Sequence, residues 1–261
     1  MIFVDGIKEI IMSEFKKIPA FIKRQPTLDL IIWVNIILFL LAQMLSAFKL
    51  FSLRYIALQA FTPNIYNFWH LLTYGFFHQG LLALLFNMIL LYYFGRIFAD
   101  FESGKKLFLT YLAGIILGGL FFIVSYHWFS SFYIQKNPLL GASAGVMAVI
   151  TYISLYVPEY TIKIRFLGHF KLLHLLIFLI LFNLLQIPLG NPGGYFAHLG
   201  GLTAGFLIFL WDKLRRPSLS NKKRNHSANI DRLLDKINHS GYESLSDDEK
   251  EELFKKSQSK N

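Results

Sequence analysis

The feature that most constrains this chain is a series of six long apolar runs that carry almost no charge. The runs cover residues 30–48, 79–98, 107–126, 143–157, 172–188 and 195–211. Between Leu30 and Trp211 the only carboxylates are Asp100, Glu102 and Glu159. About 20 apolar residues are enough for an α-helix to cross the roughly 30 Å hydrocarbon core of a bilayer. The sequence therefore predicts an all-α membrane protein with six transmembrane helices.

The composition excludes several other classes of protein. Hydrophobic residues make up 54% of the chain and charged residues 16%, against about 25% charged residues in an ordinary soluble domain. The absence of cysteine excludes a disulfide framework, a thiolate nucleophile and cysteine-based metal sites. The basic residues that give the net charge of +10 border the apolar runs, which favours a lipid bilayer over nucleic acid as the partner.

The connections between the runs alternate in basic charge. The segments 1–26, 96–106, 158–171 and 212–224 hold 5, 3, 3 and 6 Lys and Arg, whereas 49–70, 127–142 and 188–194 hold 2, 1 and 0. Because cytoplasmic connections are enriched in these residues, both termini are predicted to be cytoplasmic. The N-terminal residues indicate an amphipathic interfacial helix and not a signal peptide or mitochondrial presequence. We expect an integral, multi-pass protein of a bacterial inner membrane.

The predicted organisation has three parts. Residues 1–27 form a cytoplasmic amphipathic segment, 28–213 a six-helix membrane domain, and 214–261 a basic linker with a small helical tail. The tail has one apolar helical stripe and then an S-x-x-E capping pattern before a second short helix. It is too small for a core of its own, so a docking or regulatory role and no role are both open.

Ser143 is the candidate nucleophile. It follows Gly141 and Ala142 and opens the fourth run, whose 15 residues span only about 22 Å as a helix. The loop before it is therefore expected to lie at membrane depth, buried or beside a wet cavity. Free N–H groups in the first helical turn, that of Ser143 included, suit an oxyanion. The alternative is that these small residues only pack one helix against another.

His198 is the candidate general base. It lies about one turn inside the sixth run, beside a small-residue stripe formed by Ala197, Gly201 and Gly205. An ionisable residue within a span favours a functional role, although a structural hydrogen bond is the alternative. The fourth and sixth runs point in the same direction, so the topology brings Ser143 and His198 to the same level. All carboxylates after residue 30 fall on the cytoplasmic side, which predicts a Ser–His dyad without a third carboxylate.

Other polar residues in the runs receive lesser assignments. Asn87 can donate to an oxyanion, or instead bond one helix to another. His78 is predicted to be structural, and packing roles are assigned to Asn35, Gln43, Asn183 and Gln186. The eight histidines include no pair at i, i+4, and no metal or cofactor is expected.

The fifth run, 172–188, is a candidate gate, and its outer end leads into the segment 187–194. This segment has two prolines and three glycines, is predicted not to hold a stable helix, and leads into the run that carries His198. Its movement would expose the dyad to a transmembrane substrate. A plain connecting loop is the alternative.

Several motifs, in this order, resemble those of the rhomboid intramembrane serine proteases. They are Trp69-His70-Leu71-Leu72-Thr73-Tyr74 with Phe77-His78, Leu85-Phe86-Asn87-Met88, Glu102-Ser103-Gly104, Gly141-Ala142-Ser143 and Ala197-His198-Leu199-Gly200-Gly201. The resemblance covers about residues 28–213. It implies the six-helix rhomboid core, Ser143 as nucleophile, His198 as base and Asn87 as an oxyanion donor. It also implies cleavage of single-pass membrane proteins near the outer end of their helix.

The chain departs from the family pattern at two positions. Ala83 stands where the family usually has a histidine that serves as a second oxyanion donor, and Ala144 stands where a glycine commonly follows the serine. The first departure keeps open a rhomboid-like pseudoprotease that binds transmembrane helices without cutting them. A six-helix transporter is the third reading, although neither inverted repeats nor charged residues within the spans support it. The sequence does not indicate an oligomeric state.

Overall fold

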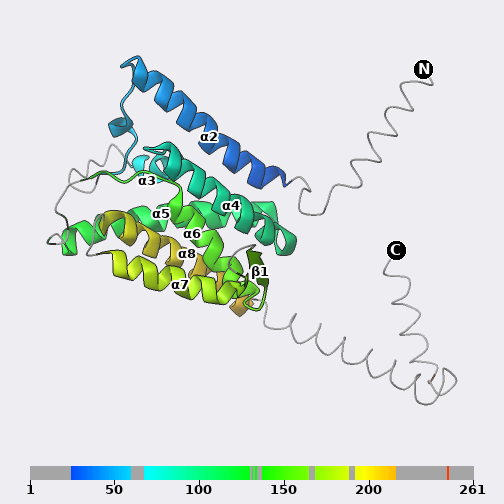
Figure 1. The fold of residues 1–261 in the computed structure, drawn as a ribbon. Coiled ribbons are helices and arrows are strands. Elements are labelled where there is room, and N and C mark those ends of the chain that lie inside the picture. The colour runs from blue at the N-terminus through cyan, green and yellow to red at the C-terminus, as the bar shows by residue number, and fades with distance from the viewer. Residues whose placement is uncertain are drawn as a thin grey trace, which may run out of the picture. The chain divides into compact units, whose positions relative to one another are not determined.

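A computed structural model describes residues 25–59, 68–129, 131, 133, 137–164, 168–187, 192–215 and 246. Its long helices are α2 (Pro26–Ala47), α4 (Leu81–Phe101), α5 (Gly104–Trp128), α6 (Ser143–Tyr156), α7 (Leu172–Gln186) and α8 (Pro192–Arg215). They lie side by side with roughly aligned axes (Figure 1). Each coincides with one predicted apolar run. The predicted amphipathic segment before residue 25 and the predicted tail helices lie outside the described residues.

Four of these helices are long and apolar enough to cross a membrane. These are α2, α4, α5 and α8, with 22, 21, 25 and 24 residues. The helices α6 and α7 have 14 and 15 residues, so they are about 21 and 23 Å long. The protein is thus a mostly helical integral membrane protein, and its fourth apolar run forms a short helix.

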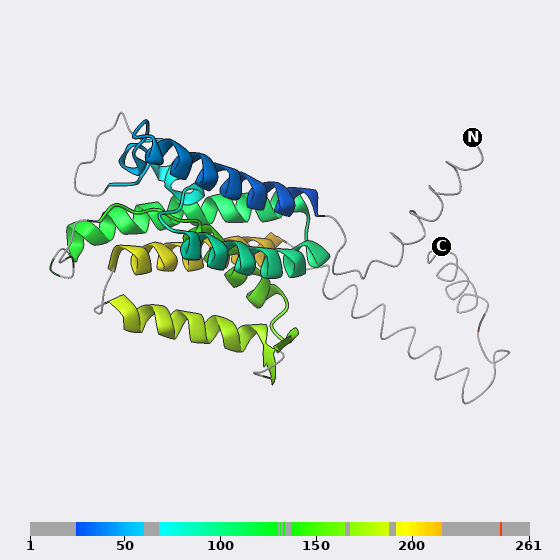
Figure 2. The ribbon, with the colours of Figure 1, turned by 45° about the horizontal axis from the view of Figure 1, so that its top comes forward.

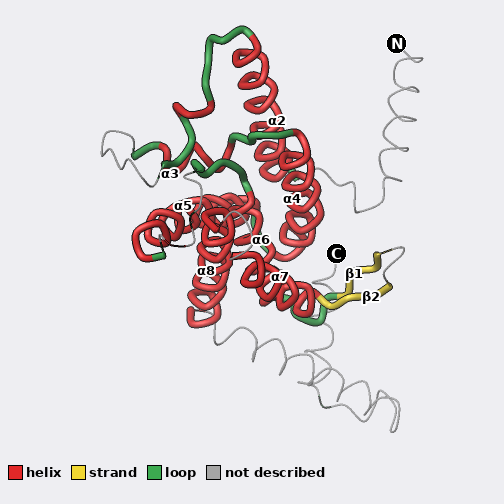
Figure 3. Tube along the Cα trace, turned by 60° about the vertical axis from the view of Figure 1, so that its left-hand side comes forward, coloured by secondary structure: helices red, strands yellow, loops and turns green. Residues whose placement is uncertain are grey.

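The short helix α6 lies at the centre of the bundle. Ten of its 14 residues are buried, and it contacts α4, α5 and α7 (Figure 3). The surrounding helices expose large apolar side chains, such as Leu30 and Trp33 on α2 at 61% and 60%. An apolar surface of this kind is suited to lipid, whereas α6 is shielded from lipid by its neighbours.

Small residues set how closely α6 and α8 pack. A Cβ atom added at Gly201 would collide with the carbonyl oxygen of Ala144, and one added at Gly205 with that of Ala148. Both pairs advance by four residues in the same direction, so α6 and α8 run parallel. Helices approach this closely only where small residues let their backbones meet.

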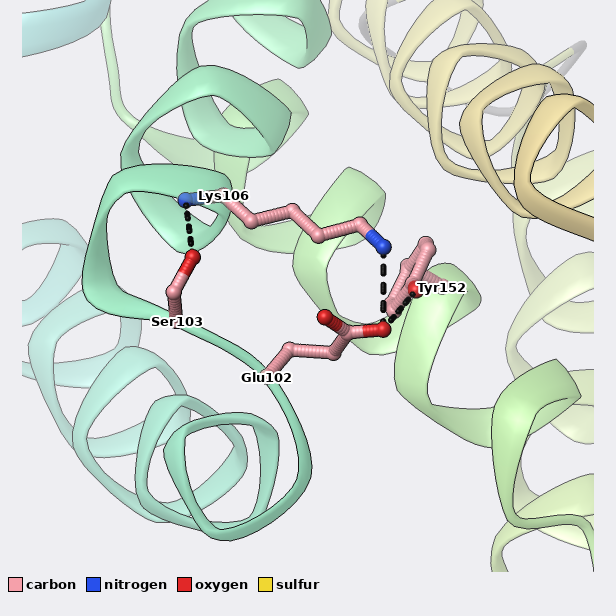
Figure 4. A network of polar contacts seen from close by, with 4 residues as sticks. All are labelled: Glu102, Ser103, Lys106 and Tyr152. Carbon is pink, nitrogen blue, oxygen red and sulfur yellow. Dashed lines mark hydrogen bonds and ion pairs between the residues drawn. The ribbon is translucent and has the colours of Figure 1, made fainter. Parts of the chain in front are cut away.

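A polar network ties the turn between α4 and α5 to α6. The carboxylate of Glu102 accepts hydrogen bonds from the Tyr152 hydroxyl and from Lys106 Nζ, each at 2.9 Å (Figure 4). Ser103 caps α5 by accepting from the backbone N–H of Lys106 at 3.3 Å. Tyr152 lies nine residues after Ser143, which is about 13 Å along the helix. The network therefore fixes the end of α6 that is remote from Ser143.

Two local predictions were wrong. The segment 158–171 was expected to be a loop, but β1 (Thr161–Ile164) and β2 (Gly168–Lys171) pair as an antiparallel hairpin between α6 and α7 (Figure 2). The segment 187–194 was expected not to hold a helix, but α8 begins at Pro192. Proline is favoured in the first helical position, where its missing N–H is not needed. The rest of that segment, residues 188–191, lies outside the described residues.

Candidate active site

The loop before Ser143 is held by backbone hydrogen bonds. Leu139 and Leu58 exchange two N–H···O bonds of 2.8 and 3.1 Å, and the Gly141 N–H donates to the Tyr74 carbonyl at 3.0 Å. Gly141 has φ +126°, which only glycine adopts without strain. This irregular segment is buried at Leu139, Gly141 and Ala142, so neighbouring backbone satisfies it as a membrane interior requires.

Ser143 is the first residue of α6 and is half-buried. The residue before it, Ala142, makes no side-chain cap. The first N–H groups of a helix have no partner within the helix and present a partial positive charge. A negative oxygen at this end of α6 would therefore be stabilised.

The parallel packing of α6 and α8 brings His198 to the same end as Ser143. Gly201, which meets Ala144, is one turn after His198 on the same face of α8. Ala197, beside His198, contacts α5 at Gly118, which in turn meets Ala144. Within the described residues, no hydrogen bond joins the Ser143 hydroxyl to His198. Catalytic hydrogen bonds are often long before substrate binds.

Asn183 is a site residue that the sequence analysis missed. It was assigned a packing role, but its Oδ1 lies 2.9 Å from Nδ1 of His198. Its Nδ2 donates to the Tyr195 carbonyl at 2.9 Å, and its side chain is 2% exposed. The Tyr195 ring also packs edge-on against the His198 ring, with centroids 5.9 Å apart. The helix α7 thus supplies a buried amide to the candidate base on α8.

His78 and Asn87 lie together beside the Gly141–Ala142 turn. The Ala142 N–H donates to His78 Nε2 at 3.3 Å, and Asn87 Nδ2 lies 3.1 Å from the same nitrogen. Asn87 Nδ2 is also the nearest atom to a Cβ placed on Gly141, at 3.9 Å. Because Nε2 accepts from a backbone N–H, the ring proton must be on Nδ1. One amide hydrogen of Asn87 then shares the single lone pair of Nε2 with the Ala142 N–H, and the other amide hydrogen is not used on His78.

The remaining polar residues lie where they cannot contribute chemistry directly. Asn35 bonds to the Ile31 carbonyl and the Tyr111 hydroxyl, in agreement with its packing role. Gln43 and Ala83 are exposed. Ala83 has no polar side-chain atom, so position 83 supplies no hydrogen-bond donor to the site. Glu159 pairs with Lys171, and the hydrogen bond from Lys171, together with its charge, lowers the pKa of that carboxyl. Among the described residues, no group of three or more His, Cys, Asp or Glu gathers to hold a metal.

Comparisons with known proteins match two parts of the chain. The family model of the Rhomboid domain matches residues 66–213, which is more than half of the chain. A family of unknown function, DUF6576, matches residues 219–259. The RHOMBOID-like protein 12, mitochondrial, of Arabidopsis thaliana is 29% identical over 157 residues, or 56% of this chain. The match covers 46% of that relative, so the chain spans about half of its length.

Proposed function

Because the chain belongs to the rhomboid family, we propose that it is an intramembrane serine endopeptidase with Ser143 as its nucleophile and His198 as its general base. The observation that carries the proposal is the close parallel packing of α6 and α8 at Ala144 and Gly201. It supports contact between a half-buried hydroxyl and an imidazole at the same end of both helices. If the small residues served only to pack the helices, the contact between the buried Asn183 amide and the His198 ring would have no explanation.

The proposed reaction follows from these groups. Ser143 Oγ attacks the scissile carbonyl while Nε2 of His198 takes its proton, and the imidazolium then protonates the leaving amine. The N–H of Ser143 and the free amide hydrogen of Asn87 stabilise the oxyanion. Water, activated by the same histidine, hydrolyses the acyl-enzyme. Neither a cofactor nor a metal is needed.

The membrane arrangement belongs to the proposal. All six long helices cross the bilayer with both termini cytoplasmic, and the membrane is a bacterial inner membrane. The substrates are single-pass membrane proteins, cut near the outer end of their helix. Support comes from the length of α6, because a helix of about 21 Å within a core of about 30 Å leaves Ser143 below the surface.

A pseudoprotease that binds transmembrane helices without cutting them is the second candidate. Two observations favour it. The Ser143 hydroxyl has no hydrogen bond to His198 in the described residues, and Ala83 supplies no oxyanion donor. Loss of one such donor costs about 10²–10³ in rate in a soluble protease, which would leave little activity.

Labelling by a fluorophosphonate probe separates the two candidates, because the probe reacts with activated serines. We expect the purified protein to be labelled and to cleave a model single-pass substrate, and Ser143→Ala and His198→Ala to lose both activities. Ser154→Ala is a matched control on α6, since the Ser154 hydroxyl is buried without a partner in the described structure. Full cleavage by either site variant would remove the mechanism. An unlabelled wild-type protein that still binds the substrate would establish the pseudoprotease.

A further inference from the structure

The amide of Asn183 has a single orientation. Its Nδ2 donates to the Tyr195 carbonyl at 2.9 Å, which leaves Oδ1 facing Nδ1 of His198 at 2.9 Å. The opposite orientation would set Oδ1 against a carbonyl oxygen and Nδ2 against the ring, losing the bond to Tyr195. An oxygen of this kind accepts hydrogen bonds and cannot donate them. Nδ1 of His198 must therefore carry a proton.

This contact selects one tautomer of the neutral imidazole. With the proton on Nδ1, the lone pair is on Nε2, which is the nitrogen that the proposed reaction uses as base. In the other tautomer, Nδ1 and the amide oxygen would face each other with two lone pairs. At 2% exposure, the amide of Asn183 is shielded from bulk solvent, which makes an unpaired amide costly.

We propose that Asn183 is a positioning residue, which holds His198 in the tautomer and ring orientation needed to deprotonate Ser143. The inference rests on the proposed function. It extends the predicted dyad to a chain of three residues, Ser143, His198 and Asn183, in which the third group is a neutral amide. No carboxylate is required, which suits a site far from the Glu102 network. Because Asn183 lies on α7 and His198 on α8, the orientation of the base depends on how these two helices pack.

The first test compares amide substitutions on α7. Asn183→Leu keeps the volume but loses the acceptor, and we expect kcat to fall about 10–100-fold with little change in KM, as when the second partner of a functional histidine is removed. Gln186→Leu removes an amide one turn away on the same helix and serves as the matched control, with kcat within twofold of wild type. If kcat falls by the same factor in Asn183→Leu and in Gln186→Leu, the loss comes from altered packing of α7, and the proposal is overturned.

A second variant gives a readout that a packing role would not move. Asn183→Asp keeps the acceptor and adds a negative charge, which favours the imidazolium form of His198. The acid limb of the kcat/KM profile should then shift to higher pH. An acid limb at the wild-type pH, in an Asn183→Asp protein that retains activity, would contradict the contact.

A spectroscopic measurement separates this inference from the proposed function. In protein with ¹⁵N-labelled histidine, the His198 signals are identified by their loss in His198→Ala. We expect a single Nδ1–H tautomer in wild type and a mixture of tautomers in Asn183→Leu, whether or not the protein hydrolyses peptides. An unlabelled wild type in the fluorophosphonate assay would refute the protease alone. An unchanged tautomer in Asn183→Leu would refute the role of Asn183 alone.

Discussion

At the scale of single residues, His78 holds together two groups that the proposed oxyanion site needs. Its Nε2 accepts from the Ala142 N–H and contacts the Asn87 amide. We expect His78→Leu to lower the free energy of unfolding by about 1–3 kcal/mol, because two polar groups lose their acceptor in a buried place. We also expect kcat to fall more than KM rises. Denaturant titration and kinetics with a model substrate measure the two effects.

The matched variant is His78→Gln, which offers an amide oxygen as a replacement acceptor. It should recover part of both losses. Equal effects of Leu and Gln at this position would mean that the ring volume of His78 matters and its nitrogen does not.

Sequence reasoning found some of these residues and missed the partners of others. Ser143, His198 and Asn87 are conspicuous because each is a polar residue in an apolar run. Asn183 is equally conspicuous, but its hydrogen bonds reach Tyr195 and His198 on another helix. Which amide meets which histidine depends on how α7 and α8 pack, and local sequence does not encode that packing. His78 was assigned a structural role without any indication that it contacts Asn87.

At the scale of secondary structure elements, hydropathy and length predicted the six long helices well. The hairpin of β1 and β2 was missed although residues 161–166 alternate polar and apolar side chains, because the segment 158–171 was considered only as a basic connection between two apolar runs. The start of α8 was missed because proline and glycines were taken as signals against a helix. Gly193 is instead buried, and a Cβ there would lie 2.5 Å from a carbon of Phe122. Its lack of a side chain serves close packing and not flexibility.

The contact between α6 and α8 gives a test at this scale. Gly201→Ala adds a Cβ that collides with the backbone of Ala144. Alanine gains up to about 1 kcal/mol in helix propensity, but overpacking costs about 1–3 kcal/mol, so we expect a net loss of stability. The helices must also separate, so cleavage should fall at least tenfold. Titration with SDS and the cleavage assay measure these changes.

Gly80→Ala is the control for this experiment, because nothing lies within 4 Å of a Cβ at Gly80. It should leave stability and cleavage near the wild-type values. If Gly201→Ala behaves in the same way as Gly80→Ala, then close approach of the two helices does not support the site.

At the scale of the whole molecule, two properties of the short helices bear on how many helices cross the bilayer. Helices α6 and α7 are shorter than the bilayer core, which alone would favour four crossings. The segment 158–171 between them has three basic residues in its sequence, Lys163, Arg165 and Lys171, and basic connections favour the cytoplasmic side. The burial of α6 among its neighbours removes the length argument for that helix, because lipid does not contact a shielded helix and its short length carries little cost. For α7, of whose residues only Leu172, Leu176 and Asn183 are buried, the basic charge of the connection carries the argument. We therefore expect six crossings.

The naturally cysteine-free chain allows a direct test with single cysteines at exposed positions. Trp128→Cys lies at the end of α5, Lys105→Cys at its start, and His169→Cys in the hairpin. With six crossings, a membrane-impermeant maleimide should label Trp128→Cys in intact cells, and Lys105→Cys and His169→Cys only after permeabilisation. With four crossings, in which α6 and α7 stay on the outer side, His169→Cys would be labelled together with Trp128→Cys. That result would place the hairpin outside and refute the proposed topology, whereas Lys105→Cys reports the same side in both cases and so serves as the internal control.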